Sequence, residues 1–134
     1  MLGHYLMFNG NCTGALEFYK EALAAKVIEV QRYGDMPSSP DFNVPDDKKN
    51  LILHARFSID GGEVMCADAH ERHIPGSNMY VSITSTDEAY VQKAWDLLKK
   101  GGEVYMELAP SFFALAHGSL RDKFGVNWMF TAMK

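Results

Sequence analysis

The sequence LILHARFSI at residues 51–59 carries two side chains that could do chemistry, His54 and Arg56. Alternate residues of a β-strand share a face, so these two would lie together, opposite Ala55 and Phe57. A neutral histidine can act as a general base near neutral pH, and an arginine can bind an anion. The spacing favours a polar site on one face of the strand; an exposed or capped pair on a sheet surface is the alternative.

The two cysteines and a nearby carboxylate form a second group of candidates. Cys12 falls at the expected start of a helix, where the helix N-terminus can lower the pKa of a thiol, although no partner base lies close in sequence. Cys66 lies in a strand that reads as buried, and buried cysteines usually act as small apolar side chains. Asp68 ends the same strand, either as a turn former or as a pocket carboxylate. His70 and His73 lie in a loop, at a spacing more typical of exposed surface than of a metal site.

The elements that must position these residues can be read from the hydrophobic pattern. Apolar residues every three to four positions indicate helices, and short alternating runs between turn residues indicate strands. In the first half we expect a helix from about residue 15 and strands at about 3–9, 26–33, 51–59 and 63–68. In the second half we expect a helix that stops at Gly101-Gly102 and strands at about 78–84, 103–108, 114–120 and 126–133.

Three local details accompany these elements. Asn11 or Thr13 is expected to cap the first helix. Ser85 and Glu88 match the S-x-x-E capping box at the start of the second helix. Strict alternation along residues 51–59 places Ile52 on the polar face of its strand.

The two halves of the chain repeat one pattern. Residues 15–30 and 89–108 each read as an amphipathic helix running into a strand, with a strand before and two strands after. The helices are about 74 residues apart, too far for a solenoid repeat and suited to two copies of one small module. The sequence thus predicts one α+β domain over residues 1–134, built of βαβββ modules at about 1–70 and 77–134. A cupped mixed sheet would carry the helices on its outside.

Composition limits the classes of partner. The formal net charge is −4 and the longest runs of Lys or Arg are pairs, so the chain lacks the basic patch that nucleic-acid binding needs. No apolar run approaches the ~20 residues that span a bilayer, so we expect no membrane partner. Two cysteines are too few for a disulfide framework, so we expect reduced thiols and a cytoplasmic protein.

Several separate motifs carry a resemblance to a known family. They are YLMFNGNCTGALEFYKEAL, RYGDMP, GGEVMCADA and HGSLRDKFGVNWMF. The sequence resembles, over essentially its whole length, the PhnB-like branch of the vicinal oxygen chelate (glyoxalase/bleomycin resistance/dioxygenase) superfamily. The resemblance implies two βαβββ modules, commonly completed as a homodimer, with a cavity inside each curved sheet. It leaves the activity open, because the superfamily includes isomerases, dioxygenases, transferases and binding proteins.

Metalloenzymes of this superfamily hold a divalent ion with His and Glu or Gln side chains at four seats, on strands 1, 4, 5 and 8 of the fold. At the strand 8 seat this sequence has Met129, a poor ligand for such metals. The strand 5 seat falls on Asn78, whose oxygen can bind a metal but rarely anchors a site alone. The strand 4 seat falls on Met65 or Cys66, depending on the register.

His4 is the one histidine that could occupy a family seat, on strand 1. Counting back from the first helix places His4 in the seat, whereas taking Leu6 and Phe8 as core residues places Gly3 there. A slip of one residue turns every side chain of a strand to the other face, so both alternatives stay open. One histidine among four seats favours no metal cofactor.

The expectation that follows is a protein that binds a small, partly apolar molecule without the full metal-ligand set, its reaction unknown. The candidate pocket residues are His54, Arg56, Cys66, Asp68, Asn78, Phe112 and Met129, of which Phe112 lies where the family often has an aromatic rim residue. One alternative is a lyase, isomerase or dioxygenase with a divalent metal held by His4, Asn78 and a residue of the partner chain. The other is a protein that sequesters a drug or toxin. The sequence does not decide whether the chain is an enzyme.

Overall fold

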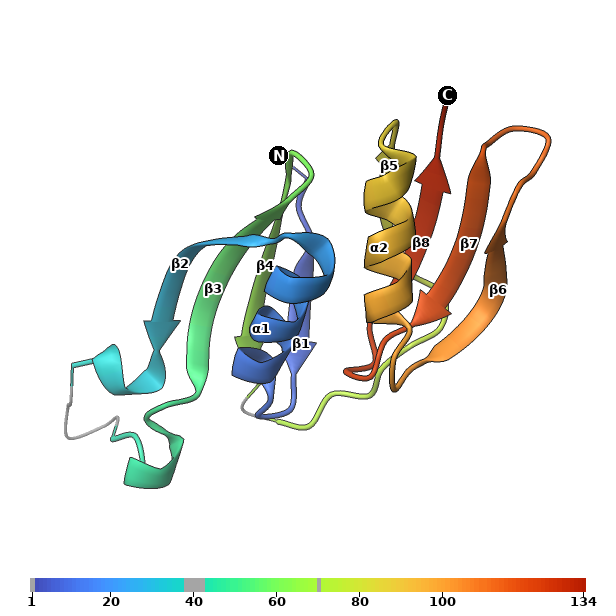
Figure 1. Ribbon diagram of the computed structural model, residues 1–134. Coiled ribbons are helices and arrows are strands. Elements are labelled where there is room, and N and C mark those ends of the chain that lie inside the picture. Colours follow the sequence, from blue (N-terminus) through green and yellow to red (C-terminus); the bar gives the residue numbers. More distant parts are fainter. Residues whose placement is uncertain (1, 38–42, 70) are drawn as a thin grey trace. The chain divides into compact units, whose positions relative to one another are not determined.

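The computed structural model describes residues 2–37, 43–69 and 71–134. The chain forms two compact units, one of residues 1–20 and 25–73 and one of residues 21–24 and 74–134. Each unit holds a four-stranded sheet in which one strand pair is parallel and the others are antiparallel. Figure 1 shows one α-helix with each sheet.

The first unit follows the order strand, helix and three strands. Its strands are ordered β1-β4-β3-β2 across the sheet, with β1 parallel to β4. Asp60 and Gly61 join β3 to β4 with positive φ angles of 46° and 84°, as a two-residue hairpin requires. The elements are β1 (Tyr5–Phe8), α1 (Cys12–Leu23), β2 (Lys26–Arg32), the short 3-10 turns η1 (Tyr33–Asp35) and η2 (Asp46–Lys48), β3 (Ile52–Ile59) and β4 (Gly62–Asp68).

The second unit repeats this order. Its strands are arranged β5-β8-β7-β6, with β5 parallel to β8. The α+β class and the two βαβββ modules predicted from the sequence are therefore confirmed. The elements are β5 (Val81–Ser85), α2 (Glu88–Leu98), β6 (Glu103–Ala109), β7 (Ala116–Arg121) and β8 (Asn127–Ala132).

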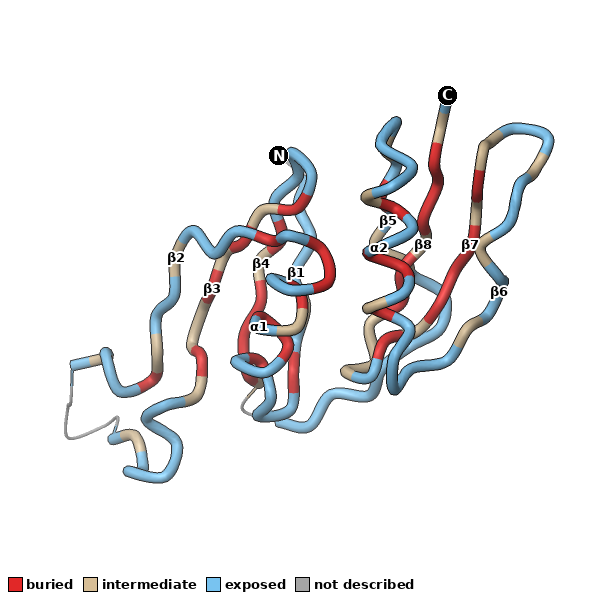
Figure 2. Tube along the Cα trace, in the orientation of Figure 1, coloured by how far each residue is buried: buried red, intermediate tan, exposed pale blue. Residues whose placement is uncertain are grey.

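The core of the first unit lies between α1 and one face of its sheet. The Tyr19 ring stacks on Phe57 with centroids 5.9 Å apart, and both residues are fully buried. Figure 2 shows the buried positions concentrated on α1, β3 and β4, whereas β2 is mostly exposed. Burying a large apolar side chain stabilises the fold by roughly 1.5–3 kcal/mol, so this helix–sheet contact is a main source of stability for the unit.

Ile52 departs from the alternation predicted for β3. It is fully buried, although strict alternation places it on the polar face. The pairing with β2 slips at this point, because Gln31 lies opposite His54 while Arg32 lies opposite Ile52. Such a β-bulge inserts an extra residue and turns the side chains before it to the other face. Leu53 is that extra residue, and the prediction for Ile52 was wrong for this reason.

The core of the second unit is aromatic. The Trp95 ring of α2 meets Phe130 of β8 edge to face, with centroids 6.0 Å apart. Trp128 is fully buried, and its indole Nε1 donates a 2.8 Å hydrogen bond to Asp122 Oδ2. The other carboxylate oxygen of Asp122 accepts from the backbone N–H groups of Phe124 and Val126. This carboxylate closes the turn between β7 and β8 and satisfies the only polar atom of the buried indole.

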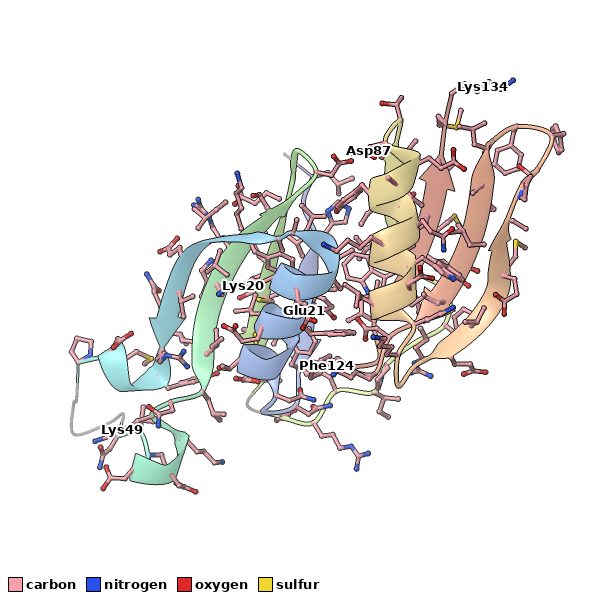
Figure 3. All side chains as sticks on the ribbon, viewed as in Figure 1. Lys20, Glu21, Lys49, Asp87, Phe124 and Lys134 are labelled. Atoms are coloured by element: carbon pink, nitrogen blue, oxygen red, sulfur yellow. The ribbon has the colours of Figure 1, made fainter. Side chains whose placement is uncertain are left out.

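The cap of α2 differs from the predicted Ser85–Glu88 capping box. Asp87 is the N-cap residue, and its Oδ1 accepts a 3.0 Å hydrogen bond from Tyr90 N. Ser85 Oγ instead accepts from the backbone N–H of Asp87. Asp87 lies at the N-terminal end of α2 in Figure 3. The helix therefore begins later than the S-x-x-E pattern predicts, because a carboxylate two residues further along the chain is an equally good cap.

The start of β5 is also later than predicted, at residue 81 instead of about 78. The Asn127 side chain donates through Nδ2 to the carbonyl oxygens of Gly76 and Met79, at 2.8 and 3.0 Å. These side-chain bonds satisfy backbone groups that a longer strand would have paired in the ladder. Neither α1 nor α2, the helices of the described residues, is long and apolar enough to cross a membrane.

Candidate functional site

Each sheet has a face covered by its own helix and a face that this helix does not cover, which we call the helix-free face. In the first sheet the row Leu6–Cys66–Ala55 lies on the helix side, so the neighbouring row Tyr5–Met65–Arg56 lies on the helix-free side. In the second sheet, Phe130 contacts Trp95 of α2, so the row that contains Phe130 lies on the helix side. The neighbouring rows therefore lie on the helix-free side. The helix-free faces carry Tyr5, Met7, His54, Arg56, Met65 and Ala67 in the first unit, and Ser82, Thr84, His117, Ser119, Met129 and Thr131 in the second.

His54 is hydrogen-bonded to Tyr5 on the first helix-free face. Tyr5 Oη lies 2.9 Å from His54 Nδ1, and the two rings have centroids 5.7 Å apart. Burial raises the pKa of Tyr5, and the nearby Cys66 and Cys12 sulfurs raise it further. Tyr5 is therefore a neutral phenol at neutral pH and can donate to Nδ1. The neutral imidazole then carries its own proton on Nε2, which can donate to a ligand oxygen.

Arg56 is engaged in ion pairs on the same face. Its Nε lies 2.9 Å from Glu63 Oε1 and its Nη1 lies 3.7 Å from Glu29 Oε2. Two carboxylates thus compensate the guanidinium charge. An anion would have to compete with both, so Arg56 is a weaker candidate for an anion clamp than its sequence position indicates.

Cys66 lies under α1, on the other side of the sheet from His54. Its Sγ is 3.5 Å from Cys12 Sγ, and both cysteines are fully buried. This placement removes Cys66 from the candidate pocket residues. The hydrogen bond to Cys66, burial and the Asp68 charge all raise the pKa of Cys12, the reverse of the lowering that a helix N-terminus can cause.

Asp68 is buried and is hydrogen-bonded to groups from three segments of the first unit. Its Oδ1 accepts from Cys12 N and its Oδ2 accepts from Ile52 N, both at 2.9 Å. Its carbonyl oxygen accepts from the Tyr33 hydroxyl, also at 2.9 Å. These contacts assign Asp68 a structural position, as the cap of α1, and remove it from the pocket. A cap supplied from 56 residues away replaces the local caps, Asn11 or Thr13, predicted from the sequence.

His117 is the polar centre of the second helix-free face, and sequence reasoning did not single it out. Its Nδ1 lies 3.0 Å from Thr131 Oγ1, and its ring meets Phe113 at a centroid distance of 5.0 Å. Met129 and Ser119 lie opposite one another in the next row of that face. The signal available in the sequence was the alternation of His117, Ser119 and Arg121 in β7, the same pattern that identified His54.

His54 and His117 occupy matching positions in the two modules. The last parallel pair is Phe8–Asp68 in the first sheet and Ser85–Ala132 in the second. One row earlier, His117 lies opposite Thr131. Continuing the antiparallel register of β3 and β4 by one residue places His54 beside Ala67 in the equivalent row. Each module therefore presents one histidine at the same place on its helix-free face, with Nδ1 bound by a hydroxyl.

The remaining candidates lie at the margins of the second unit. Asn78 is exposed and precedes β5, outside the strand. Phe112 is completely exposed in the β6–β7 connection, where its ring packs edge to face on Phe113. In the first unit, His73 is exposed and its backbone is held by the Asn9 side chain through two hydrogen bonds. His70 lies outside the described residues.

The residues at the family's metal seats do not fit a divalent ion. Gly3 lies on the face of Met65, since a Cβ at Gly3 would be 3.4 Å from Met65 Cε, so His4 is turned to the other face. Met65 and Met129, at the strand 4 and strand 8 seats, offer thioethers, which are poor ligands for a hard or borderline cation. Within residues 2–37, 43–69 and 71–134, no three His, Cys, Asp or Glu side chains gather closely enough to hold a metal.

A separate cavity of about 250 Å³ lies beside η1 and η2. Its lining residues are Tyr33, Asn43, Val44, Pro45, Lys48, Leu51 and Ala69. Tyr33 contributes a hydroxyl that is already committed to Asp68 O, and Lys48 contributes the only charged side chain of this lining. We assign this cavity no ligand.

Comparison with known proteins places this geometry in a family. A family model described as 3-demethylubiquinone-9 3-methyltransferase matches residues 2–131. Protein YjdN of Escherichia coli strain K12 is 29% identical over 140 residues, covering 99% of this chain and 95% of YjdN. These matches span the whole βαβββ repeat.

Solved structures agree with this result. Protein PA1353 of Pseudomonas aeruginosa is 30% identical and superposes with a TM-score of 0.85, over 99% of this chain and 97% of PA1353. A PhnB protein of Bacillus cereus is 29% identical with a TM-score of 0.78, over 98% of both chains. FosX, a fosfomycin resistance protein of Listeria monocytogenes, shares the fold at 12% identity and a TM-score of 0.67, over 100% of this chain and 93% of FosX. The resemblance read from the sequence motifs is confirmed: the chain belongs to the 3-demethylubiquinone-9 3-methyltransferase family, a PhnB-like family of the vicinal oxygen chelate superfamily.

Proposed function

We propose that this chain binds a small, partly apolar molecule on the helix-free faces of its sheets, without a metal held at the four family seats. The observation that carries the proposal is the repeated histidine. His54 and His117 stand at matching positions, each with Nδ1 bound to a hydroxyl at 2.9 or 3.0 Å. A hydrogen bond at Nδ1 orients the imidazole and leaves Nε2 for a ligand.

The side chains around the histidines indicate the chemistry of the ligand. A neutral ring protonated at Nε2 donates to a carbonyl, carboxylate or hydroxyl oxygen. Met65 and Met129 lie on the same faces and offer polarisable apolar contact. The Phe113 ring beside His117 adds an aromatic surface. A ring with adjacent oxygen substituents meets these requirements, and the 3-demethylubiquinone in the family description is such a molecule.

Calorimetric titration with a water-soluble, short-chain 3-demethylubiquinone tests this proposal. We expect His54→Gln and His117→Gln each to weaken binding about three- to tenfold, the loss of one hydrogen bond to the ligand. His4→Gln and His73→Gln are matched controls, because these histidines are exposed and lie off the helix-free faces. Equal affinity in all four variants, or no binding of the quinone at all, would contradict the proposal.

The alternative functions make different predictions for the same samples. A metal-dependent enzyme requires stoichiometric metal in protein purified without chelator, and loss of that metal in His4→Ala. A sequestering protein returns the bound molecule unchanged after long incubation, whereas an enzyme converts it. Elemental analysis and chromatography of the recovered ligand distinguish these outcomes.

We further propose that the protein is a cytoplasmic homodimer. Apolar side chains exposed on the edge strand β2 support association: Val27, Ile28 and Val30 are each more than a third exposed. Phe112 adds a fully exposed aromatic ring. Cys12 and Cys66 are free thiols, as is usual in a reducing compartment.

A further inference from the structure

Two thiols meet between α1 and the first sheet. Cys12 is the first residue of α1 and Cys66 lies within β4, 54 residues later. Their sulfur atoms are 3.5 Å apart and both side chains have no exposed surface. The Cys12 thiol donates its hydrogen to Cys66 Sγ. A buried cysteine usually stands alone as a small apolar side chain, so a contacting pair has a chemical capacity that neither residue has by itself.

The backbone around the pair is already held in place. Asp68 Oδ1 binds the backbone N–H of Cys12, and Asp68 belongs to the same strand as Cys66. A disulfide has an S–S bond of about 2.05 Å, so the two sulfurs need to approach by about 1.5 Å. Side-chain rotation and a small shift of the first turn of α1 can supply that movement.

We propose that Cys12 and Cys66 are an oxidation site, where a small hydroperoxide converts the two thiols to an intramolecular disulfide. The Cys66 sulfur attacks one peroxide oxygen and the O–O bond breaks. The released oxygen takes up the proton of the Cys66 thiol and leaves as water or, from an alkyl hydroperoxide, as the alcohol. This step oxidises Cys66 to a sulfenic acid. The Cys12 sulfur then attacks Cys66 Sγ, the S–O bond breaks, and the hydroxyl leaves with the Cys12 proton as water.

The order of the two attacks follows from the contacts. Cys12 donates its S–H to Cys66 Sγ, so Cys66 is the acceptor sulfur of the pair. The same bond, burial and Asp68 raise the pKa of Cys12, which makes Cys12 the second sulfur to react. The lack of exposed surface also selects the oxidant by size, admitting hydrogen peroxide ahead of bulky thiol reagents. This inference does not depend on the proposed function.

Peroxide titration of the purified full chain tests the inference. After treatment, the protein is denatured, free thiols are blocked with N-ethylmaleimide, and an unreduced digest is analysed by mass spectrometry. We expect both cysteines to escape labelling and one linked pair of peptides to contain them. We also expect the thermal midpoint to rise by several degrees and to return on reduction, because the cross-link closes a loop of more than fifty residues.

The controls separate a disulfide from other oxidation. Cys12→Ser and Cys66→Ser should show no linked peptide and no rise in the midpoint; Cys12→Ala and Cys66→Ala serve where serine disturbs the fold. Oxidation of Met79 and Met106, which are 73% and 55% exposed, verifies the peroxide dose. The inference is overturned if both cysteines still react with N-ethylmaleimide once these methionines are oxidised. Sulfinic acid at either cysteine, or a disulfide between two chains, would overturn it equally.

Discussion

Asp68 shows how one side chain can organise a module. A buried carboxylate is stable only when its oxygens accept hydrogen bonds. Here each oxygen accepts from a backbone N–H, one at the start of α1 and one at the start of β3. Because both groups are donors, no amide or hydroxyl side chain can satisfy them both as a carboxylate does.

Replacing Asp68 should therefore destabilise the protein more than replacing a comparable exposed cap. In Asp68→Asn, the amide nitrogen faces one of the two backbone donors, and we expect a loss of about 2–3 kcal/mol in the free energy of unfolding. Asp87→Asn is the matched control, because Asp87 caps α2 at an exposed position and Asn is an equally good N-cap. Urea denaturation of both variants measures the difference. Equal losses would show that the Asp68 contacts are not specific to a carboxylate.

Tyr33 makes stability depend on alkaline pH. Its hydroxyl is buried and donates to Asp68 O, and burial, with the Asp68 charge, raises the pKa of Tyr33 above 10.0. At pH values between the pKa of Tyr33 in the unfolded chain and its higher pKa in the folded chain, the unfolded chain loses this proton and the folded chain keeps it. The free energy of unfolding therefore falls as pH rises. The stabilisation is fully present below the unfolded pKa.

Tyr33→Phe tests this dependence. At pH 7 we expect the variant to be less stable by about 1 kcal/mol, the loss of one hydrogen bond. The gap between the two proteins should narrow as pH is raised from about 9 to 11, through the tyrosine titration range. Some alkaline loss should remain in the variant, since the pKa values of Tyr5 and Cys12 are also raised. A gap that stays constant over this range would contradict the assignment.

At the level of elements, the β6–β7 ladder depends on a close backbone approach at Gly118. A Cβ at this position would lie 2.9 Å from Leu108 Cα, Leu108 N and Met106 O. These are backbone atoms of β6, so they cannot give way as a flexible side chain can. Gly118 is also the residue between His117 and Ser119 of the second helix-free face.

Gly118→Ala should open this ladder. We expect a loss of about 1–3 kcal/mol in stability, the usual result of forcing atoms into a packed region. Gly62→Ala is the control, because Gly62 is also a strand glycine and its added Cβ would meet only Ile59 O at an ordinary 3.5 Å. Thermal denaturation of the two variants provides the comparison. Similar stability of both would show that the β6 backbone can move away.

Elements were predictable where the signal is local. Alternating and helical periodicities predicted eight strands and two helices, because those patterns depend on near neighbours. The face of Ile52 was not predictable, since a bulge in the pairing with β2 has no signature inside β3. The cap of α1 was missed for a similar reason, as it comes from Asp68.

At the scale of the whole molecule, the proposed homodimer is tested by the mass of the protein in solution. Light scattering after size-exclusion chromatography should give twice the 15.0 kDa mass of one chain. Ile28→Lys should shift the protein toward monomer, because this half-exposed residue lies at a bulge of the edge strand β2, where a charge opposes association. Lys26→Gln is the control on the same strand. A wild-type mass of 15.0 kDa would rule out the dimer.

The sequence by itself determined the repeat, the α+β class and the family, because periodicity, turn residues and motifs are properties of neighbouring residues. Only the tertiary structure decided the face of His4 and the neighbours of His117. The pairing of Tyr5 with Met65 turns His4 away from the metal seat, and the pairing across β7 and β8 sets His117 beside Thr131. Strand register decides both, and register depends on contacts between residues far apart in the chain.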